Sequence, residues 1–157
     1  MMVVDWKFGS NTYRIMAYQH IFLLMLFAIF LILSLLHLYW TLGGKWGLDA
    51  SLPTDEKGEK LLQPGKFETF IVFFVLGLFA VYYLRLTSFI EFSLPHGLVQ
   101  VISWVIPIIF LIRSIGDFKY VGFFKKHTSS LFAKNDSRYF SPLCLLIAIL
   151  GFSIQYL

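Results

Sequence analysis

Several side chains that could bind or transform a ligand lie near the ends of long apolar segments. His37 lies well inside the first of these segments, and Ser34 and Thr41 share its face of a helix. An ionisable side chain at such depth seldom faces lipid, because desolvation of its charged form is unfavourable. His37 is therefore predicted to face neighbouring helices. It could act there as a binding or acid–base group, or as a neutral histidine that only satisfies a hydrogen bond.

A second polar group follows the third apolar segment. Arg113, Asp117 and Tyr120 are spaced by four and three residues, so they share one face if the helix continues that far. Arg113 and Asp117 are predicted to pair along this helix. The pair could be exposed and simply end the span, or it could turn inward and present a guanidinium to a phosphate or carboxylate.

The last apolar segment carries a stripe of small and polar residues at helical spacing. The stripe consists of Ser141, Cys144, Ala148, Gly151 and Gln155. Such stripes favour close helix packing in lipid. Cys144 has no basic neighbour in sequence, so nothing predicts an activated thiolate.

Four apolar segments must position these residues. The chain has 157 residues, of which 58% are hydrophobic and 14% charged, whereas soluble domains are roughly half apolar and a quarter charged. We predict an all-α fold, a four-helix transmembrane bundle with an up-down-up-down path. Its spans are predicted at about 21–42, 67–84, 97–112 and 139–157. Residues 1–20 are predicted to form an N-terminal interfacial segment, and residues 21–157 a single membrane domain.

The up-down path brings the polar groups to one end of the bundle. The C-terminal ends of the first and third helices meet the N-terminal ends of the second and fourth. We call this end the loop-one face; it carries the loops 43–66 and 113–138. The candidate ligand-binding residues there are His37, Trp40, Arg113, Asp117, Tyr120, Ser141 and Cys144. Aromatic residues such as Trp40 also fit an anchoring role at the membrane surface.

Two functional interpretations fit this arrangement. In the first, the loop-one face binds a membrane lipid, another apolar small molecule or a partner membrane protein. In the alternative, the chain is a small membrane enzyme acting on a lipid or quinone. His37 and Asp117 would then form the acid–base pair, and Arg113 would hold an anionic headgroup. A transporter or channel is less favoured, because few charges lie within the apolar segments.

Charge and cysteine content exclude other classes. Ten of the 13 Lys and Arg residues lie in the loops of the loop-one face, where they indicate cytoplasmic loops and outside termini rather than a nucleic-acid surface. A single cysteine excludes an internal disulfide. The four histidines show no spacing typical of metal ligands, so no metal site and no cofactor is predicted.

Several strings of this sequence resemble a known family. They are HLYWTLGGKWG, LPT, LLQPGKFET, IRSIGDFKYVGFFKK and FSPLCLL. Together they resemble a bacterial family of small four-helix integral membrane proteins, which is catalogued only as a domain of unknown function. The resemblance covers about Leu31 to the C-terminus. It implies a four-span fold in the bacterial inner membrane, and it brings no activity, substrate or cofactor.

Overall fold

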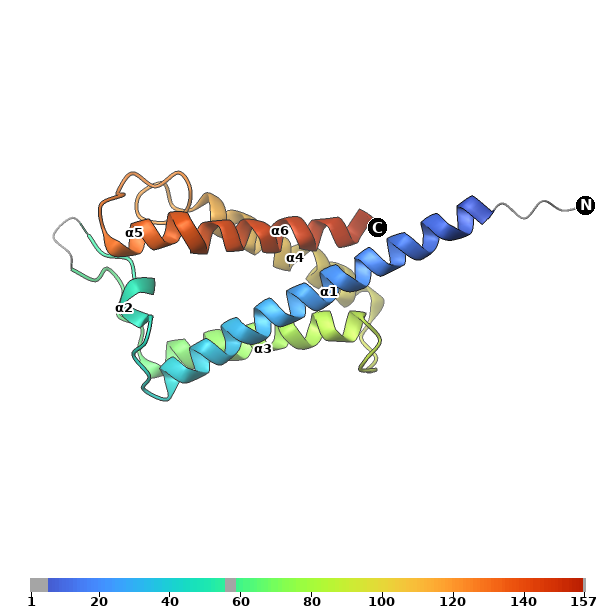
Figure 1. Ribbon diagram of the computed structural model, residues 1–157. Helices are drawn as coiled ribbons and strands as arrows, with labels where there is room; N and C mark the ends of the chain where they lie inside the picture. The colour runs from blue at the N-terminus through green and yellow to red at the C-terminus, as the bar shows by residue number, and fades with distance from the viewer. Residues whose placement is uncertain (1–5, 56–58, 157) are drawn as a thin grey trace, which may run out of the picture.

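The computed structural model describes residues 6–55 and 59–156, with side chains described from residue 15 onward. It is entirely helical apart from turns, loops and one isolated bridge. The long helices are α1 (Trp6–Thr41), α3 (Lys66–Leu86), α4 (His96–Ile115) and α6 (Ser141–Tyr156). A short helix α2 (Leu48–Ser51) lies in the loop after α1 (Figure 1). The predicted all-α fold with four spanning helices is confirmed.

Four stretches are long and apolar enough to cross a membrane. They are Ile15–Thr41, Lys66–Leu86, His96–Ile115 and Leu131–Tyr156. The C-terminal ends of the first three stretches lie within three residues of the predicted C-terminal ends. The fourth begins eight residues earlier than predicted, because helix α5 (Leu131–Asn135) and a π-helical turn η1 (Asp136–Phe140) run directly into α6. The chain thus has the helices of a multi-pass membrane protein.

The π-helical turn has a local cause in Pro142. A proline inside an α-helix lacks an N–H, and its ring collides with the carbonyl four residues earlier. The wider turn of η1 lies immediately before Pro142, and the Ser141 N–H bonds the Asp136 carbonyl five residues back. The helix therefore continues through the proline by widening, as π-bulges do.

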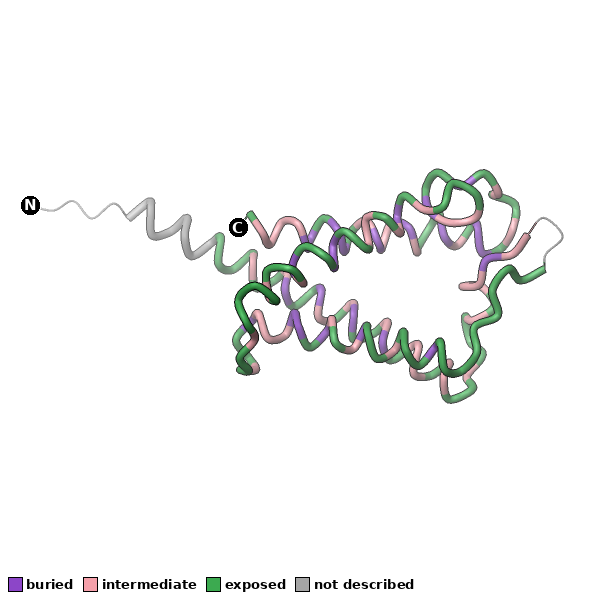
Figure 2. The backbone as a smooth tube through the Cα atoms, turned by 180° about the vertical axis from the view of Figure 1, so that it is seen from behind, coloured by how far each residue is buried: buried purple, intermediate pink, exposed green. Residues whose placement is uncertain are grey.

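The helices form two pairs. α1 packs along α3, α4 packs along α6, and α1 touches α6 where the pairs meet. Figures 1 and 2 show that the two pairs converge near the end of α6 and diverge towards α2 and α5. Phe30 of α1 is fully buried. Its ring stacks on Tyr83 at 5.6 Å and meets the edge of Phe110 at 5.2 Å, so one aromatic side chain joins three helices.

The α4–α6 contact depends on Pro107 and Gly151. Pro107 frees the carbonyl of Ser103, four residues earlier, and the side-chain amide of Gln155 donates to that oxygen at 3.4 Å. A Cβ placed on Gly151 would lie 2.9 Å from Cβ of Pro107. Ser141, Cys144, Ala148 and Gly151 are all buried. The small-residue stripe on the last helix therefore does face its neighbours.

Both termini are expected on one side of the membrane. The described part of α1 begins, and α6 ends, at the same end of the bundle (Figure 1). A reporter fused to a chain truncated after Lys60 and a reporter fused to the C-terminus of the full chain should therefore give opposite signals, with the Lys60 fusion cytoplasmic. Equal signals would contradict four spans, and a reversed pair would contradict the orientation.

Candidate functional site

A cavity of about 440 Å³ lies between the two helix pairs at the loop-one face. All four spanning stretches and α2 contribute to its wall. Its lining residues are Leu33, Leu36, His37, Trp40, Leu48, Ser51, Leu52, Pro64, Glu68, Thr69, Val72, Leu76, Phe110, Arg113, Phe140, Leu143, Cys144 and Ile147. The volume falls in the range of small-molecule sites, about 300–1,000 Å³. The divergence of the two helix pairs is what leaves room for it.

The cavity has a polar end and an apolar end. Going along α1, α3 and α4 from the loop-one face into the bundle, the lining changes from polar to apolar. His37 gives way to Leu33, and Arg113 gives way to Phe110. On α3, Glu68 gives way to Leu76. This gradient runs along the helix axes, so the cavity suits a molecule with a polar head and an apolar tail.

His37 is held by its own helix. Its Nδ1 lies 2.8 Å from the Leu33 carbonyl, which can only accept, so Nδ1 carries the proton and Nε2 is an acceptor in the neutral ring. The Trp40 ring meets the His37 ring edge-on at 4.8 Å. Trp40 in turn donates from Nε1 to the Trp46 carbonyl at 2.8 Å, which ties the following loop to α1. The cavity wall at α1 is therefore fixed by local contacts.

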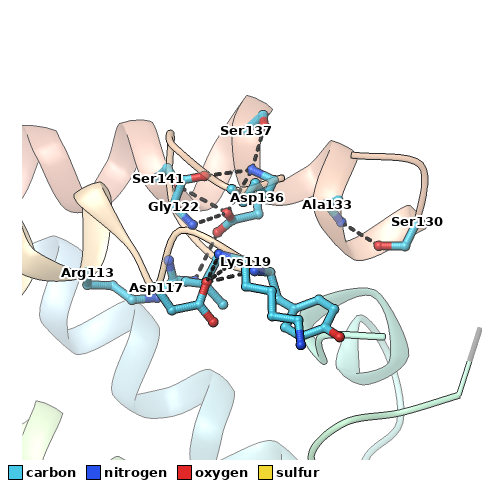
Figure 3. Close-up of polar contacts among 12 residues, drawn as sticks. Arg113, Asp117, Lys119, Gly122, Ser130, Ala133, Asp136, Ser137 and Ser141 are labelled. Carbon is cyan, nitrogen blue, oxygen red and sulfur yellow. Dashed lines mark hydrogen bonds and ion pairs between the residues drawn. The ribbon is translucent and has the colours of Figure 1, made fainter. Parts of the chain in front are cut away.

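A buried ionic cluster lies beside the cavity at Asp136, whose side chain is fully buried (Figure 3). Arg113 Nη2 donates to its Oδ1 at 3.0 Å, and Lys125 Nζ donates to its Oδ2 at 3.0 Å. The backbone N–H of Gly122 and the hydroxyl of Ser141 also donate to Oδ2, at 2.8 and 3.1 Å. Four donors thus satisfy one carboxylate, as a buried charge requires.

The loop 116–130 delivers two of these four donors, and two glycines shape it. Gly116 and Gly122 have φ of 91° and 88°, a region that glycine adopts without strain. A Cβ at Gly116 would collide with the Val121 carbonyl, and a Cβ at Gly122 with the Ile115 carbonyl. This close crossing of the backbone directs the Gly122 N–H towards Asp136. It also brings Lys125 next to Asp136, where the Lys125 side chain is 1% exposed.

Asp117 does not pair with Arg113, so that prediction is wrong. α4 ends at Ile115 because Gly116 leaves the helical conformation. Oδ1 of Asp117 instead accepts from the backbone N–H groups of residues 119, 120 and 121, at 2.7–2.9 Å. Partial burial alone would raise the pKa of this carboxyl, but the amides that donate to it hold the pKa below its usual value. Asp117 is an exposed loop cap.

The structure divides the seven candidate residues into two sets. His37, Trp40, Arg113 and Cys144 line the cavity. Asp117, Tyr120 and Ser141 are not among its lining residues. The Tyr120 ring stacks on the His127 ring at 4.7 Å, and the Ser141 hydroxyl donates a hydrogen bond to Asp136. The described residues therefore do not bring His37 and Asp117 together as an acid–base pair.

Sequence reasoning missed Asp136 and Lys125, which form the centre of the cluster. Both lie in the segment 113–138, which the sequence predicts to be a basic loop. One available signal was Gly116 and Gly122, a glycine pair able to fold the loop back on itself. The other was a carboxylate five residues before Ser141, on the same chain segment as the last apolar run. Glu68, Thr69 and Val72 were also not named, although they line the cavity.

Other features of the described residues offer less. A cavity of about 420 Å³ at the opposite end of the bundle is formed by one loop around residues 85–93. Within the described part of the chain, no group of three His, Cys, Asp or Glu side chains is placed to hold a metal ion. The cavity at the loop-one face is therefore the candidate functional site.

A family comparison covers the whole of this site. The profile of a family described as "Protein of unknown function (DUF3995)" matches residues 30–151. The chain belongs to this family. The DUF3995 match includes every residue that lines the cavity and the entire Arg113–Asp136–Lys125 cluster. No curated protein and no solved structure matches the chain.

Proposed function

We propose that this protein is a non-enzymatic membrane bundle that binds a lipid in the cavity at the loop-one face. The observation that carries the proposal is the polar-to-apolar gradient along the cavity wall, from His37 and Arg113 to Leu33 and Phe110. A lipid in a bilayer changes from polar to apolar in the same order, with its head at the membrane surface and its acyl chain deeper in the bilayer. Its acyl chain would fill the space between the diverging helix pairs and would make van der Waals contacts with the side chains that line it.

Catalysis is supported less well. The enzymatic alternative needs a carboxylate beside His37, whereas the Asp117 carboxylate accepts hydrogen bonds from backbone N–H groups of its own loop. Glu68, the one carboxylate among the described residues that line the cavity, is exposed at the start of α3. The bacterial inner membrane, which the family resemblance implies, is retained as the proposed location.

A bulky side chain in the cavity should displace the lipid. Val72 lines the cavity on α3, and Val72→Trp should fill much of it. Native mass spectrometry of the purified protein in gentle detergent should show one retained lipid for the wild type. We expect at least a fivefold lower retained fraction for Val72→Trp, roughly the effect of losing 1 kcal/mol of binding free energy.

Val75→Trp provides the matched control. Val75 lies three residues further along α3, is exposed and is not among the lining residues. The Val75→Trp substitution makes the same change in size and hydrophobicity on the same helix, and should leave lipid retention unchanged. Equal retention by both variants would contradict binding in the cavity.

A further inference from the structure

Arg113 has one bonded and one unbonded terminal nitrogen. Nη2 donates to Asp136, whereas Nη1 is buried and has no hydrogen-bond partner among the described residues. The Arg113 side chain also lines the cavity. A buried N–H without an acceptor costs free energy, more so when it carries charge. Nη1 is shielded even from water, so an acceptor in the cavity would reach it once the guanidinium turns towards the cavity, and would then remove that cost.

The charges of the cluster point to the same chemistry. Arg113 and Lys125 supply two positive charges, and Asp136 supplies one negative charge. Lys125 and Asp136 are withdrawn from water, with side chains 1% and 0% exposed. The cluster therefore retains one unbalanced positive charge beside a largely apolar cavity. The Arg113 side chain is 35% exposed, so water screens part of this charge, but beside the apolar wall an anion is still attracted more strongly than in water.

We infer that the cavity takes an anionic phospholipid, whose phosphate accepts a hydrogen bond from Arg113 Nη1. The inference rests on the proposed function and adds the class of headgroup. A planar guanidinium can serve Asp136 with one nitrogen and a phosphate with the other. The acyl chain then lies along Phe110, Leu76 and Ile147 towards the middle of the bundle.

Glu68 does not reverse this choice. It lines the cavity, but it is exposed, so water can solvate its carboxylate. Arg113 Nη1 has no such access. The requirement set by the cavity is thus for an anion, and an ammonium group on the ligand would meet no buried acceptor of opposite charge. Glu68 should instead weaken anion binding through repulsion.

Lipid competition tests the inference directly. Delipidated protein is titrated with dioleoylphosphatidylglycerol and with dioleoylphosphatidylcholine, which share their chains and differ in net charge. The wild type should prefer phosphatidylglycerol by roughly tenfold, because both lipids carry the same phosphodiester and only phosphatidylcholine adds a cationic trimethylammonium group, which the unbalanced positive charge of the cluster repels. Inorganic phosphate should bind far more weakly than either lipid and should not displace them, because it lacks the chain. Displacement at equal concentration would overturn a lipid source.

Two variants change the preference in opposite directions. Arg113→Gln removes the unbalanced positive charge while Lys125 still neutralises Asp136, and should abolish most of the tenfold preference. Glu68→Gln removes the opposing charge and should raise phosphatidylglycerol affinity by roughly threefold. Misfolding cannot produce such a gain. Glu91→Gln, on the loop at the opposite end of the bundle, is the matched control and should change nothing.

The outcomes separate the two proposals. If Val72→Trp removes binding of both lipids while the wild type and Arg113→Gln bind the two lipids equally, the headgroup inference fails and the cavity stands. If Val72→Trp leaves binding of both lipids intact, the proposed function itself fails. A preference for phosphatidylcholine that disappears in Glu68→Gln would also overturn the anionic headgroup.

Discussion

Asp136→Ala is expected to destabilise the bundle by about 3–5 kcal/mol. Removing one partner of a buried ion pair leaves an uncompensated charge, and this is among the costliest single changes in proteins. Here two cations and two further donors lose their acceptor at once. Unfolding in a mixed-micelle denaturant titration, followed by circular dichroism, measures the loss.

The matched control for this change is Asp117→Ala. Asp117 also accepts three hydrogen bonds, but it is exposed and its donors are backbone amides of its own loop. Water can replace a surface cap, so we expect about 1 kcal/mol. Equal losses in the two variants would show that the cluster around Asp136 does not hold the loop 116–130 to the bundle.

Lys125→Met in the Asp136→Ala background should recover part of the lost stability. The double variant removes the buried cation that the alanine leaves without a counter-charge. The two changes should therefore be strongly non-additive, with a coupling free energy of about 1–3 kcal/mol.

Gly151→Leu should separate α4 from α6. Even a Cβ at this position would meet Cβ of Pro107 at 2.9 Å, and Pro107 belongs to a rigid ring. The remaining atoms of leucine have no room, so we expect a loss of about 1–3 kcal/mol from overpacking. The freed Ser103 carbonyl should also lose its contact with Gln155. Thermal unfolding in detergent measures the effect.

Gly97→Leu makes the same substitution where space is open. No side chain or backbone atom lies within 4 Å of a Cβ at Gly97, in the first turn of α4. We expect a change within about 0.5 kcal/mol. If Gly97→Leu destabilised the protein as much as Gly151→Leu, the loss would not be specific to the α4–α6 contact.

The sequence predicted the helices well where apolar runs are unbroken. It missed the start of the fourth spanning stretch, because Lys134, Asp136 and Arg138 look like a solvated loop. Asp136 can lie in a helix there only because Arg113 and Lys125 neutralise it. Both partners come from other segments of the chain, and a pattern read along one segment cannot show such a tertiary contact.

The candidate site was predicted in part for the same reason. Helical spacing placed His37 and Cys144 at the correct end of the bundle, and both line the cavity. Asp117 was placed on a helix that Gly116 ends, since a glycine with positive φ cannot be told from a helical glycine by spacing alone. The cavity itself arises from the angle between two helix pairs, which no local pattern encodes.

Photocrosslinking tests lipid binding in the cavity most directly. Phosphatidylglycerol with a diazirine in the middle of one acyl chain is bound to the wild-type protein in phosphatidylcholine nanodiscs and then irradiated. Mass spectrometry of the peptides locates the adduct. The account predicts adducts on the lining residues Leu76, Phe110, Leu143 and Ile147, and their loss in Val72→Trp but not in Val75→Trp. Adducts confined to exposed residues outside the cavity lining, such as Ile108 and Ile149, would contradict it.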